Sequence, residues 1–194
     1  MGSSAEKKTG CLAVLSGPSG VGKSTIIARL LENPLFSLST SATTRAPRDG
    51  EVDGREYHFL SVEAFRSRID EGAFLEWAQV HGSVYYGTLR SEVMHLQEEG
   101  HIVLLDIDVQ GFRNLTNDVP LVSVFIAPPD IETLTARLEG RGTESAESLQ
   151  ARISSVEAEL QQKDAYDHVV INRDLEVAVN TVQNLLLNHS KSEQ

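Results

Sequence analysis

The sequence has a single cysteine, Cys11, which excludes an intrachain disulfide. Because Cys11 stands in an apolar run, we expect a buried thiol, a reducing compartment and a cytoplasmic location. Basic residues are also scarce, since 17 Lys and Arg stand against 28 Asp and Glu, for a formal net charge of -11. That balance argues against nucleic acid or an acidic membrane as a partner, because binding to a phosphate backbone relies on basic patches.

Long apolar runs are missing too. No stretch approaches the roughly 18 residues of a membrane span, and no basic segment precedes an apolar one as in a secretory signal. The 194 residues suit one domain, which we expect at 10–190 with flexible polar tails at 1–9 and 190–194. A chain of this length buries roughly 70% of its unfolded surface and needs no disulfide or metal to fold.

The most informative string is CLAVLSGPSGVGKST, residues 11–25. Gly17, Gly22, Lys23 and Ser24 fit the spacing G-x-x-x-x-G-K-[ST], with a strand-like run before it and a helix-like run after it. Glycines let backbone N–H groups surround phosphate oxygens, and the helix N-terminus favours the same anion. We therefore expect an ATP site at Gly17, Pro18, Ser19, Gly20, Val21, Gly22, Lys23, Ser24 and Thr25, with the Ser24 hydroxyl on a magnesium ion. The alternative interpretation is that these glycines only form a tight turn between a strand and a helix and bind no nucleotide.

The runs CLAVLS, HIVLLDID, PLVSVFIA and HVVIN are short, β-branched and nearly continuous, which is typical of parallel strands covered on both faces. Helical segments alternate with them, and we expect these at 24–32, 109–115, 131–138, 145–163 and 175–188. The alternation predicts an α/β fold with a parallel sheet between two layers of helices. Residues 39–88 break it with short strands such as REYHFL and FLEWAQV, so we interpret them as a mostly β insert that holds the second substrate.

Within this insert, Arg45 and Arg48 precede a glycine-rich turn that leads to Tyr57. Arginine forks match phosphate geometry and a tyrosine hydroxyl adds a donor, so the group suits an anion clamp. Glu76 follows, and its carboxylate could accept the paired N–H groups of a guanine. The alternative to the anion clamp is that both arginines are solvated in a loop. The alternative for Glu76 is an ordinary carboxylate on a half-exposed strand.

The chain resembles the guanylate kinases. The resemblance covers nearly all of 10–188 and rests on motifs that stand in order: GPSGVGKST, SATTRAPRDGEVDGREYHF, FLEWAQVHGSVYYGT, LLDIDVQG, FIAPP and RLEGRGTES. It implies a P-loop core (10–38 and 89–190), a GMP-binding insert (39–88) and a helical lid (about 139–152). It also implies transfer of a phosphoryl group from ATP to GMP with Mg²⁺, by a monomer or homodimer.

The resemblance further implies roles for individual residues. It puts the guanine base near Ser41, Glu76 and Thr88 and the GMP phosphate near Arg45, Arg48, Tyr57 and Tyr86, and it includes Gly87 among the GMP-binding residues. It gives Asp108 a contact with GMP and Asp106 one with hydrated Mg²⁺, although the division between them stays open and both could simply end a strand and cap a helix. Lys23, Arg45, Arg137 and Arg152 are the expected catalytic cations, and Arg137, Arg141 and Asn172 are expected on the ATP side, Asn172 near adenine.

Two other functions remain. A kinase of the same architecture could act on ribose bisphosphate, but it would not need Glu76 and the YYG string. A guanylate-kinase-like scaffold could bind protein partners without catalysis, but it would not need the intact GKST string.

Overall fold

The computed structural model describes residues 10–80, 82–115, 119–139 and 156–192. Its larger sheet has five strands in the order β2-β7-β1-β8-β9, and every neighbouring pair is parallel. The strands are β1 (Leu12–Ser16), β2 (Phe36–Leu38), β7 (Ile102–Asp106), β8 (Val122–Ala127) and β9 (His168–Ile171). Their carboxyl ends therefore meet at one edge of the sheet, where α/β proteins bind their ligands.

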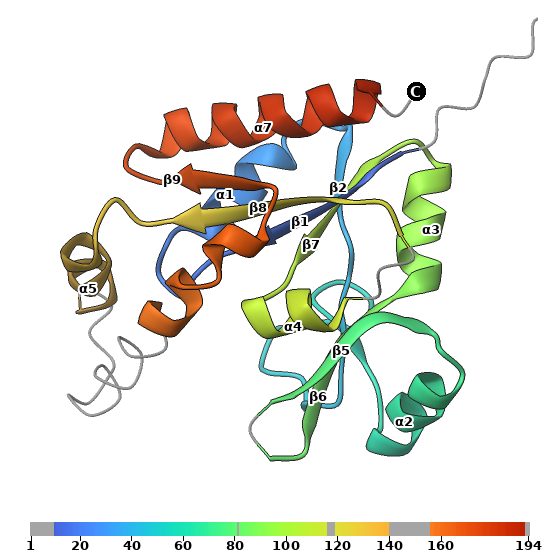
Figure 1. The fold of residues 1–194 in the computed structure, drawn as a ribbon. Coiled ribbons are helices and arrows are strands. Elements are labelled where there is room, and N and C mark those ends of the chain that lie inside the picture. The colour runs from blue at the N-terminus through green and yellow to red at the C-terminus, as the bar shows by residue number, and fades with distance from the viewer. Residues whose placement is uncertain (1–9, 81, 116–118, 140–155, 193–194) are drawn as a thin grey trace, which may run out of the picture.

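Helices cover both faces of this sheet (Figure 1). Alternate side chains of β1 enter two different cores: Ala13 and Leu15 pack with α1 (Lys23–Leu30) and α7 (Leu175–Ser192), while Leu12 and Val14 face the other way. That opposite core contains side chains of α3 (Arg90–Glu98) and α4 (Val109–Asn114). The predicted α/β architecture with helices on two faces is confirmed.

The edge strands depart from the prediction of full coverage. Val169 and Ile171 of β9 are 42% and 58% exposed, because β9 pairs only with β8 and lies at the margin of the sheet. The other edge strand, β2, was not predicted. Its three residues, FSL, are too few to give an apolar run.

A second sheet lies within the predicted insert and has the order β4-β3-β6-β5. It comprises β3 (Ala42–Thr43), β4 (His58–Phe59), β5 (Phe74–Val80) and β6 (Val84–Leu89), so the expected strand REYHFL is reduced to two residues. The helix α2 (Val62–Asp70) packs its Phe65 ring on this sheet against Phe74 and Tyr85. Sequence reasoning missed α2, although the Ser61 hydroxyl caps it by accepting a hydrogen bond from the Ala64 N–H.

The remaining helices are close to expectation. The predicted helix at 131–138 is α5 (Ile131–Glu139). The predicted helix at 145–163 lies partly outside the described residues; within its described part, residues 156–160 are helical. A short 3-10 turn, η1 (Lys163–Ala165), precedes β9. α3 was not predicted. Among the described residues, no helix is long and apolar enough to cross a membrane.

Candidate functional site

The phosphate loop joins β1 to α1 through a backbone that only glycine adopts easily. Gly22 has φ 97° and caps α1 without a side chain, so no side chain of the cap competes with an anion for the free N–H groups of the first turn. At Gly17 a Cβ atom would lie 2.3 Å from the carbonyl oxygen of Ile126 on β8. The loop can therefore pass close to the sheet only because glycine stands there.

This loop borders a cavity of about 440 Å³, which we call the phosphate-loop cavity. Eight of the nine loop residues predicted to bind ATP line it, as do Asp106, the last residue of β7, and Asp108. The exception is Val21, a residue of the loop whose side chain is fully buried in the core. The complete lining is Gly17, Pro18, Ser19, Gly20, Gly22, Lys23, Ser24, Thr25, Asp106, Asp108 and Glu159.

Asn172 supports the loop from below. Its side chain is only 4% exposed, and its Nδ2 donates a hydrogen bond of 2.8 Å to the carbonyl oxygen of Val21. Its backbone N–H is bonded to the Ala127 carbonyl at 2.8 Å, which ties the residue to the end of β8. A Cβ at Gly22 would lie 2.6 Å from the same Nδ2. Asn172 thus packs against the phosphate loop, while the predicted adenine contact stays a prediction.

Lys23 already has an anionic partner. Its Nζ lies 2.8 Å from Oδ1 of Asp106 and donates a second hydrogen bond of 3.3 Å to the Ile107 carbonyl. The Ser16 hydroxyl donates to that carbonyl at 2.8 Å. The first residue of α1 is therefore ion-paired with the last residue of β7.

A second cavity of about 360 Å³ lies between the large sheet and the insert, and we call it the acceptor cavity. Seven of its lining residues are among those predicted for the site: Lys23, Ser41, Tyr57, Glu76, Tyr86, Gly87 and Asp108. Asp106, predicted for Mg²⁺, lines it too. Sequence reasoning missed the four apolar or small residues that complete the wall: Ala78, Val80, Ile107 and Gly111.

Glu76 is the most unusual group in the acceptor cavity. It is 5% exposed, and its Oε1 accepts a hydrogen bond of 2.7 Å from the Thr88 hydroxyl. Burial raises the pKa of Glu76 to about 7; the Thr88 bond opposes this shift and the nearby charge of Asp108 adds to it. Its other oxygen, Oε2, lies beside Gly111, where a Cβ would come within 3.2 Å. Thr88 therefore orients the carboxylate, and Gly111 leaves room beside it.

Tyr57 and Tyr86 line another side of the cavity, and Arg45, which is not among the lining residues, contacts the Tyr57 ring. The Tyr57 and Tyr86 rings meet edge to face with centroids 5.9 Å apart, and the Arg45 guanidinium lies 5.3 Å from the Tyr57 centroid. Burial raises the pKa of the Tyr57 hydroxyl, so it stays a neutral donor at physiological pH. Arg48 is exposed on the loop beyond Arg45.

The two cavities share the residues Lys23, Asp106 and Asp108. Asp108 also caps α4 by accepting a hydrogen bond of 2.7 Å from the Gly111 N–H, so the capping alternative holds for this residue together with its place in both cavities. A group bound at the phosphate loop would thus face a group bound in the acceptor cavity across these three side chains.

The side chains of three predicted cationic residues lie outside the described part of the chain. Arg137 belongs to α5, but its side chain lies outside the described part of the chain, as do Arg141 and Arg152 altogether. The predicted lid at about 139–152 falls almost wholly there as well.

A parallel sheet of this order, with a phosphate loop after its central strand and a separate acceptor cavity, defines a P-loop phosphotransferase. Comparison with known proteins narrows this class. The sequence model of the guanylate kinase family matches residues 9–189, so the chain belongs to the guanylate kinase family.

Its relatives are similar over nearly their whole length. The guanylate kinase of Salinibacter ruber is 52% identical over 172 residues, which cover 87% of this chain and 90% of that protein. The guanylate kinase of Corynebacterium efficiens is 42% identical over 187 residues, covering 95% and 98%. The crystal structure of guanylate kinase from Anaplasma phagocytophilum superposes with a TM-score of 0.73 at 32% identity, covering 95% of this chain and 88% of that one.

Proposed function

We propose that the protein transfers the γ-phosphoryl group of ATP to GMP, giving ADP and GDP. The observation that carries the proposal is the meeting of the phosphate-loop cavity and the acceptor cavity at Lys23, Asp106 and Asp108. Two nucleotides bound in these cavities would have their phosphates adjacent, which is the arrangement that an in-line transfer needs. Family membership supports the same reaction.

Guanine fits the acceptor cavity by its hydrogen-bond pattern. An ionised Glu76 can accept from the N1–H and the exocyclic amine of guanine, while Thr88 holds its Oε1 in place. Adenine has no matching pair of donors and would leave a buried carboxylate without a partner. Ser41 and Gly87 line the same cavity and complete the proposed base site.

The GMP phosphate is proposed to lie near Tyr57, Tyr86 and Arg45. These three side chains already contact one another, and Arg48 lies on the same loop. Phosphate monoesters suit such a group, because arginine offers paired N–H donors and a neutral tyrosine adds one without a competing charge.

In the proposed reaction a phosphate oxygen of GMP attacks the γ-phosphorus of ATP, and the bond from that phosphorus to the β–γ bridging oxygen breaks as ADP leaves. Lys23 exchanges Asp106 for the β- and γ-phosphate oxygens and balances the charge that moves between them. Closure of the insert and lid over the substrates excludes water. Arg137, Arg141 and Arg152 are proposed to come onto the phosphates at that stage.

Two oxygen donors in the phosphate-loop cavity are suited to bind Mg²⁺. The Ser24 hydroxyl and the Asp106 carboxylate line the phosphate-loop cavity, and Mg²⁺ prefers such oxygen donors with waters and phosphates filling its other positions. Within the described residues there is no cluster of three His, Cys, Asp or Glu that could hold a metal without the nucleotide. When bound, Mg²⁺ would neutralise phosphate charge. The buried Cys11, the single cysteine of the sequence, supports a reducing, cytoplasmic location.

The test is ADP formation from ATP and Mg²⁺ with GMP, AMP, UMP, CMP and ribose bisphosphate offered separately. We expect turnover selective for GMP. Turnover with ribose bisphosphate instead would overturn the guanine site while keeping the phosphate loop. Binding of both ATP and GMP without turnover would favour the scaffold alternative.

A further inference from the structure

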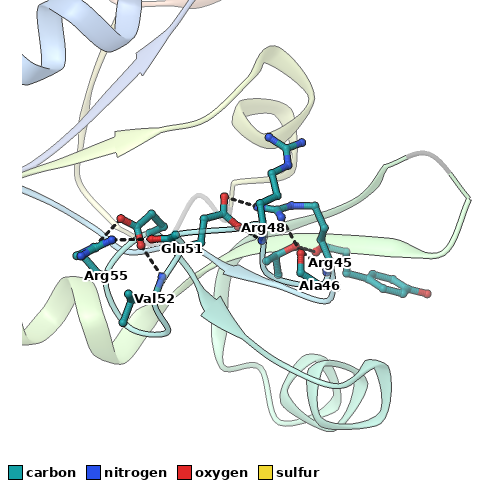
Figure 2. A network of polar contacts seen from close by, with 10 residues as sticks. Arg45, Ala46, Arg48, Glu51, Val52 and Arg55 are labelled. Atoms are coloured by element: carbon teal, nitrogen blue, oxygen red, sulfur yellow. Dashed lines mark hydrogen bonds and ion pairs between the residues drawn. The ribbon is translucent and has the colours of Figure 1, made fainter.

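Glu51 connects the two arginines of the proposed phosphate clamp (Figure 2). Its Oε1 lies 2.9 Å from Nη2 of Arg45, and its Oε2 accepts a hydrogen bond of 2.7 Å from the backbone N–H of Arg48. The Glu51 N–H in turn donates to the Arg48 carbonyl at 3.0 Å. One side chain therefore both holds a guanidinium and closes the turn that carries the next arginine.

This contact is better shielded than an ordinary surface ion pair. The Arg45 and Glu51 side chains are each only 18% exposed. The hydrogen bond from Arg45, followed by the one from the Arg48 backbone, lowers the pKa of Glu51, so the carboxylate is charged at neutral pH. Both oxygens of Glu51 thus have defined partners, and such two-point contacts give geometric specificity.

Arg45 is restrained on its other sides too. Its Nη1 donates a hydrogen bond of 2.7 Å to the Ala46 carbonyl, and its guanidinium faces the rings of Tyr57 and Phe59 at 5.3 and 5.8 Å. Glu51, and to a smaller extent Tyr86, raise the pKa of the Arg45 guanidinium. A guanidinium has about five N–H donors, so Arg45 keeps donors for a phosphate oxygen while it is held.

Arg48 differs from Arg45. Figure 2 shows its side chain extending away from the Glu51 carboxylate, and it forms no hydrogen bond or ion pair with any residue that the structure describes. Glu51 therefore fixes the guanidinium of one arginine and only the backbone of the other. The clamp has one ordered arm and one free arm before a phosphate arrives.

We propose that Glu51 is a positioning residue for the acceptor phosphate, acting through Arg45 and the Arg48 turn; this rests on the proposed function. It makes no contact with the substrate. By holding Arg45 against Tyr57 before binding, it reduces the side-chain freedom that would otherwise be lost when the phosphate monoester binds. The ligand class that benefits is any guanine compound with a 5′-phosphate, and guanosine gains nothing.

The chain offers a matched control in the same loop. Glu56 accepts a hydrogen bond of 2.7 Å from the Val52 N–H and pairs with Arg55 at 2.6 Å, in an arrangement like that of Glu51. Within the described part of the chain, the Glu56 carboxylate bonds to Val52 and Arg55 and to neither Arg45 nor Arg48. Glu56→Gln therefore disturbs the loop without releasing the clamp.

The experiment measures Kd for GMP and for guanosine by calorimetry with the wild type, Glu51→Ala, Glu51→Gln and Glu56→Gln. For Glu51→Ala we expect GMP to bind about tenfold more weakly, as for loss of one preorganised side chain, with guanosine unchanged. Glu51→Gln keeps one acceptor oxygen, enough for either Arg45 or the Arg48 N–H, and should recover part of the loss. In steady-state assays KM for GMP should rise more than kcat falls, with KM for ATP unchanged.

Equal weakening of GMP and guanosine would show a merely structural role and overturn the proposal. Unchanged GMP binding by Glu51→Ala would show that Glu51 does not assist the phosphate, and tighter binding would show that its carboxylate competes with the phosphate; either result would overturn the proposal. In an Arg45→Ala background, Glu51→Ala should weaken GMP binding less than it does in the wild type, because only the contact with the Arg48 backbone is then lost. If Glu51→Ala raised the Kd for GMP by the same factor in both backgrounds, action through Arg45 would be contradicted.

An independent readout separates this proposal from the proposed function. Without nucleotide, the Arg45 Nη2–H signal in ¹⁵N NMR should be protected from exchange in the wild type and Glu56→Gln, and lost in Glu51→Ala. If the wild type binds no GMP, the proposed function fails, and this signal still decides whether Glu51 holds Arg45.

Discussion

The phosphate-loop cavity and the acceptor cavity share Lys23, Asp106 and Asp108 but are built from different kinds of group. Apart from these three residues, the first is lined almost entirely by one continuous stretch at 17–25, whose three glycines leave backbone N–H groups open to an anion. The second is formed by side chains that come from 41 to 111, with a buried carboxylate at its centre. A backbone site recognises what all nucleoside triphosphates share, whereas a buried side chain can reject a ligand that lacks its partner.

The first prediction concerns Lys23, one of the residues shared by the two cavities, where we expect the largest effect on turnover. Lys23→Ala removes the cation that reaches both cavities, and turnover should fall by about 10²–10³-fold, the usual cost of losing one electrostatic stabiliser of a transition state. The measurement is kcat with ATP and GMP. Lys163→Ala, on η1 and outside both cavities, is the control and should leave kcat unchanged. Near-normal turnover of a folded Lys23→Ala would remove this lysine from the mechanism.

The second prediction concerns the acceptor cavity alone. Glu76→Gln replaces an acceptor by an amide, so kcat/KM for GMP should fall about 10- to 150-fold, as for loss of a hydrogen bond to a charged group. KM for ATP should stay the same, and the ratio of GMP to AMP turnover should decrease. Glu99→Gln, on the surface after α3, is the control. An unchanged ratio of GMP to AMP would mean that Glu76 does not recognise the base.

The third prediction uses pH, because the two cavities should respond to it differently. With a pKa of about 7, Glu76 changes from mostly protonated at pH 6 to mostly ionised at pH 8, so GMP affinity should rise about tenfold over this range. ATP affinity should not follow the same curve. The GMP phosphate also titrates near pH 6, and Glu76→Gln reports that contribution alone. Identical pH profiles for both proteins would contradict the assignment.

The same group makes the stability of the ligand-free protein depend on pH in the opposite direction. Because the pKa of Glu76 is raised from 4.5 to about 7 in the folded state, the native protein holds a proton there that the unfolded chain has released. Its contribution to stability is complete below pH 4.5 and is lost as the pH rises through 7. Urea unfolding at pH 5 and pH 8 should show this loss in the wild type but not in Glu76→Gln.

The smallest effect is expected where the phosphate loop depends on a side chain. Asn172→Ala leaves the Val21 carbonyl without its buried donor, which should cost about 1 kcal/mol, or roughly fivefold, in ATP affinity and lower Tm. KM for GMP should not change. Asn33→Ala, which removes an exposed local bond to the Leu35 N–H, serves as the control. An equal rise of KM for both substrates would show that Asn172 supports the whole fold rather than the loop.

The contrast between the cavities also explains what the sequence could reveal. The phosphate loop is contiguous, so its spacing and flanking runs predicted β1, the loop and α1 correctly. The bond from Asn172 to Val21 joins residues 151 positions apart, and no local pattern indicates it. The raised pKa of Glu76 depends on burial by segments that the sequence does not place together.

Local elements that were missed had weak or overlooked signals. β2 has only three residues, while α3 has a helical spacing of apolar residues at Leu89, Val93 and Leu96 that could have predicted it. Glu51 stands six positions after Arg45 in a polar loop, where any of several carboxylates could have been its partner. Its contacts with Arg45 and the Arg48 N–H are visible only in the folded turn.

The most direct test of the two-cavity account is a crystal structure with GMP and a non-hydrolysable ATP analogue. The account predicts guanine with its N1–H and amine on the Glu76 carboxylate, the GMP phosphate beside Arg45 and Tyr57, and the γ-phosphate of the analogue on Lys23. A guanine base bound away from Glu76, or both nucleotides bound on the phosphate loop, would contradict it.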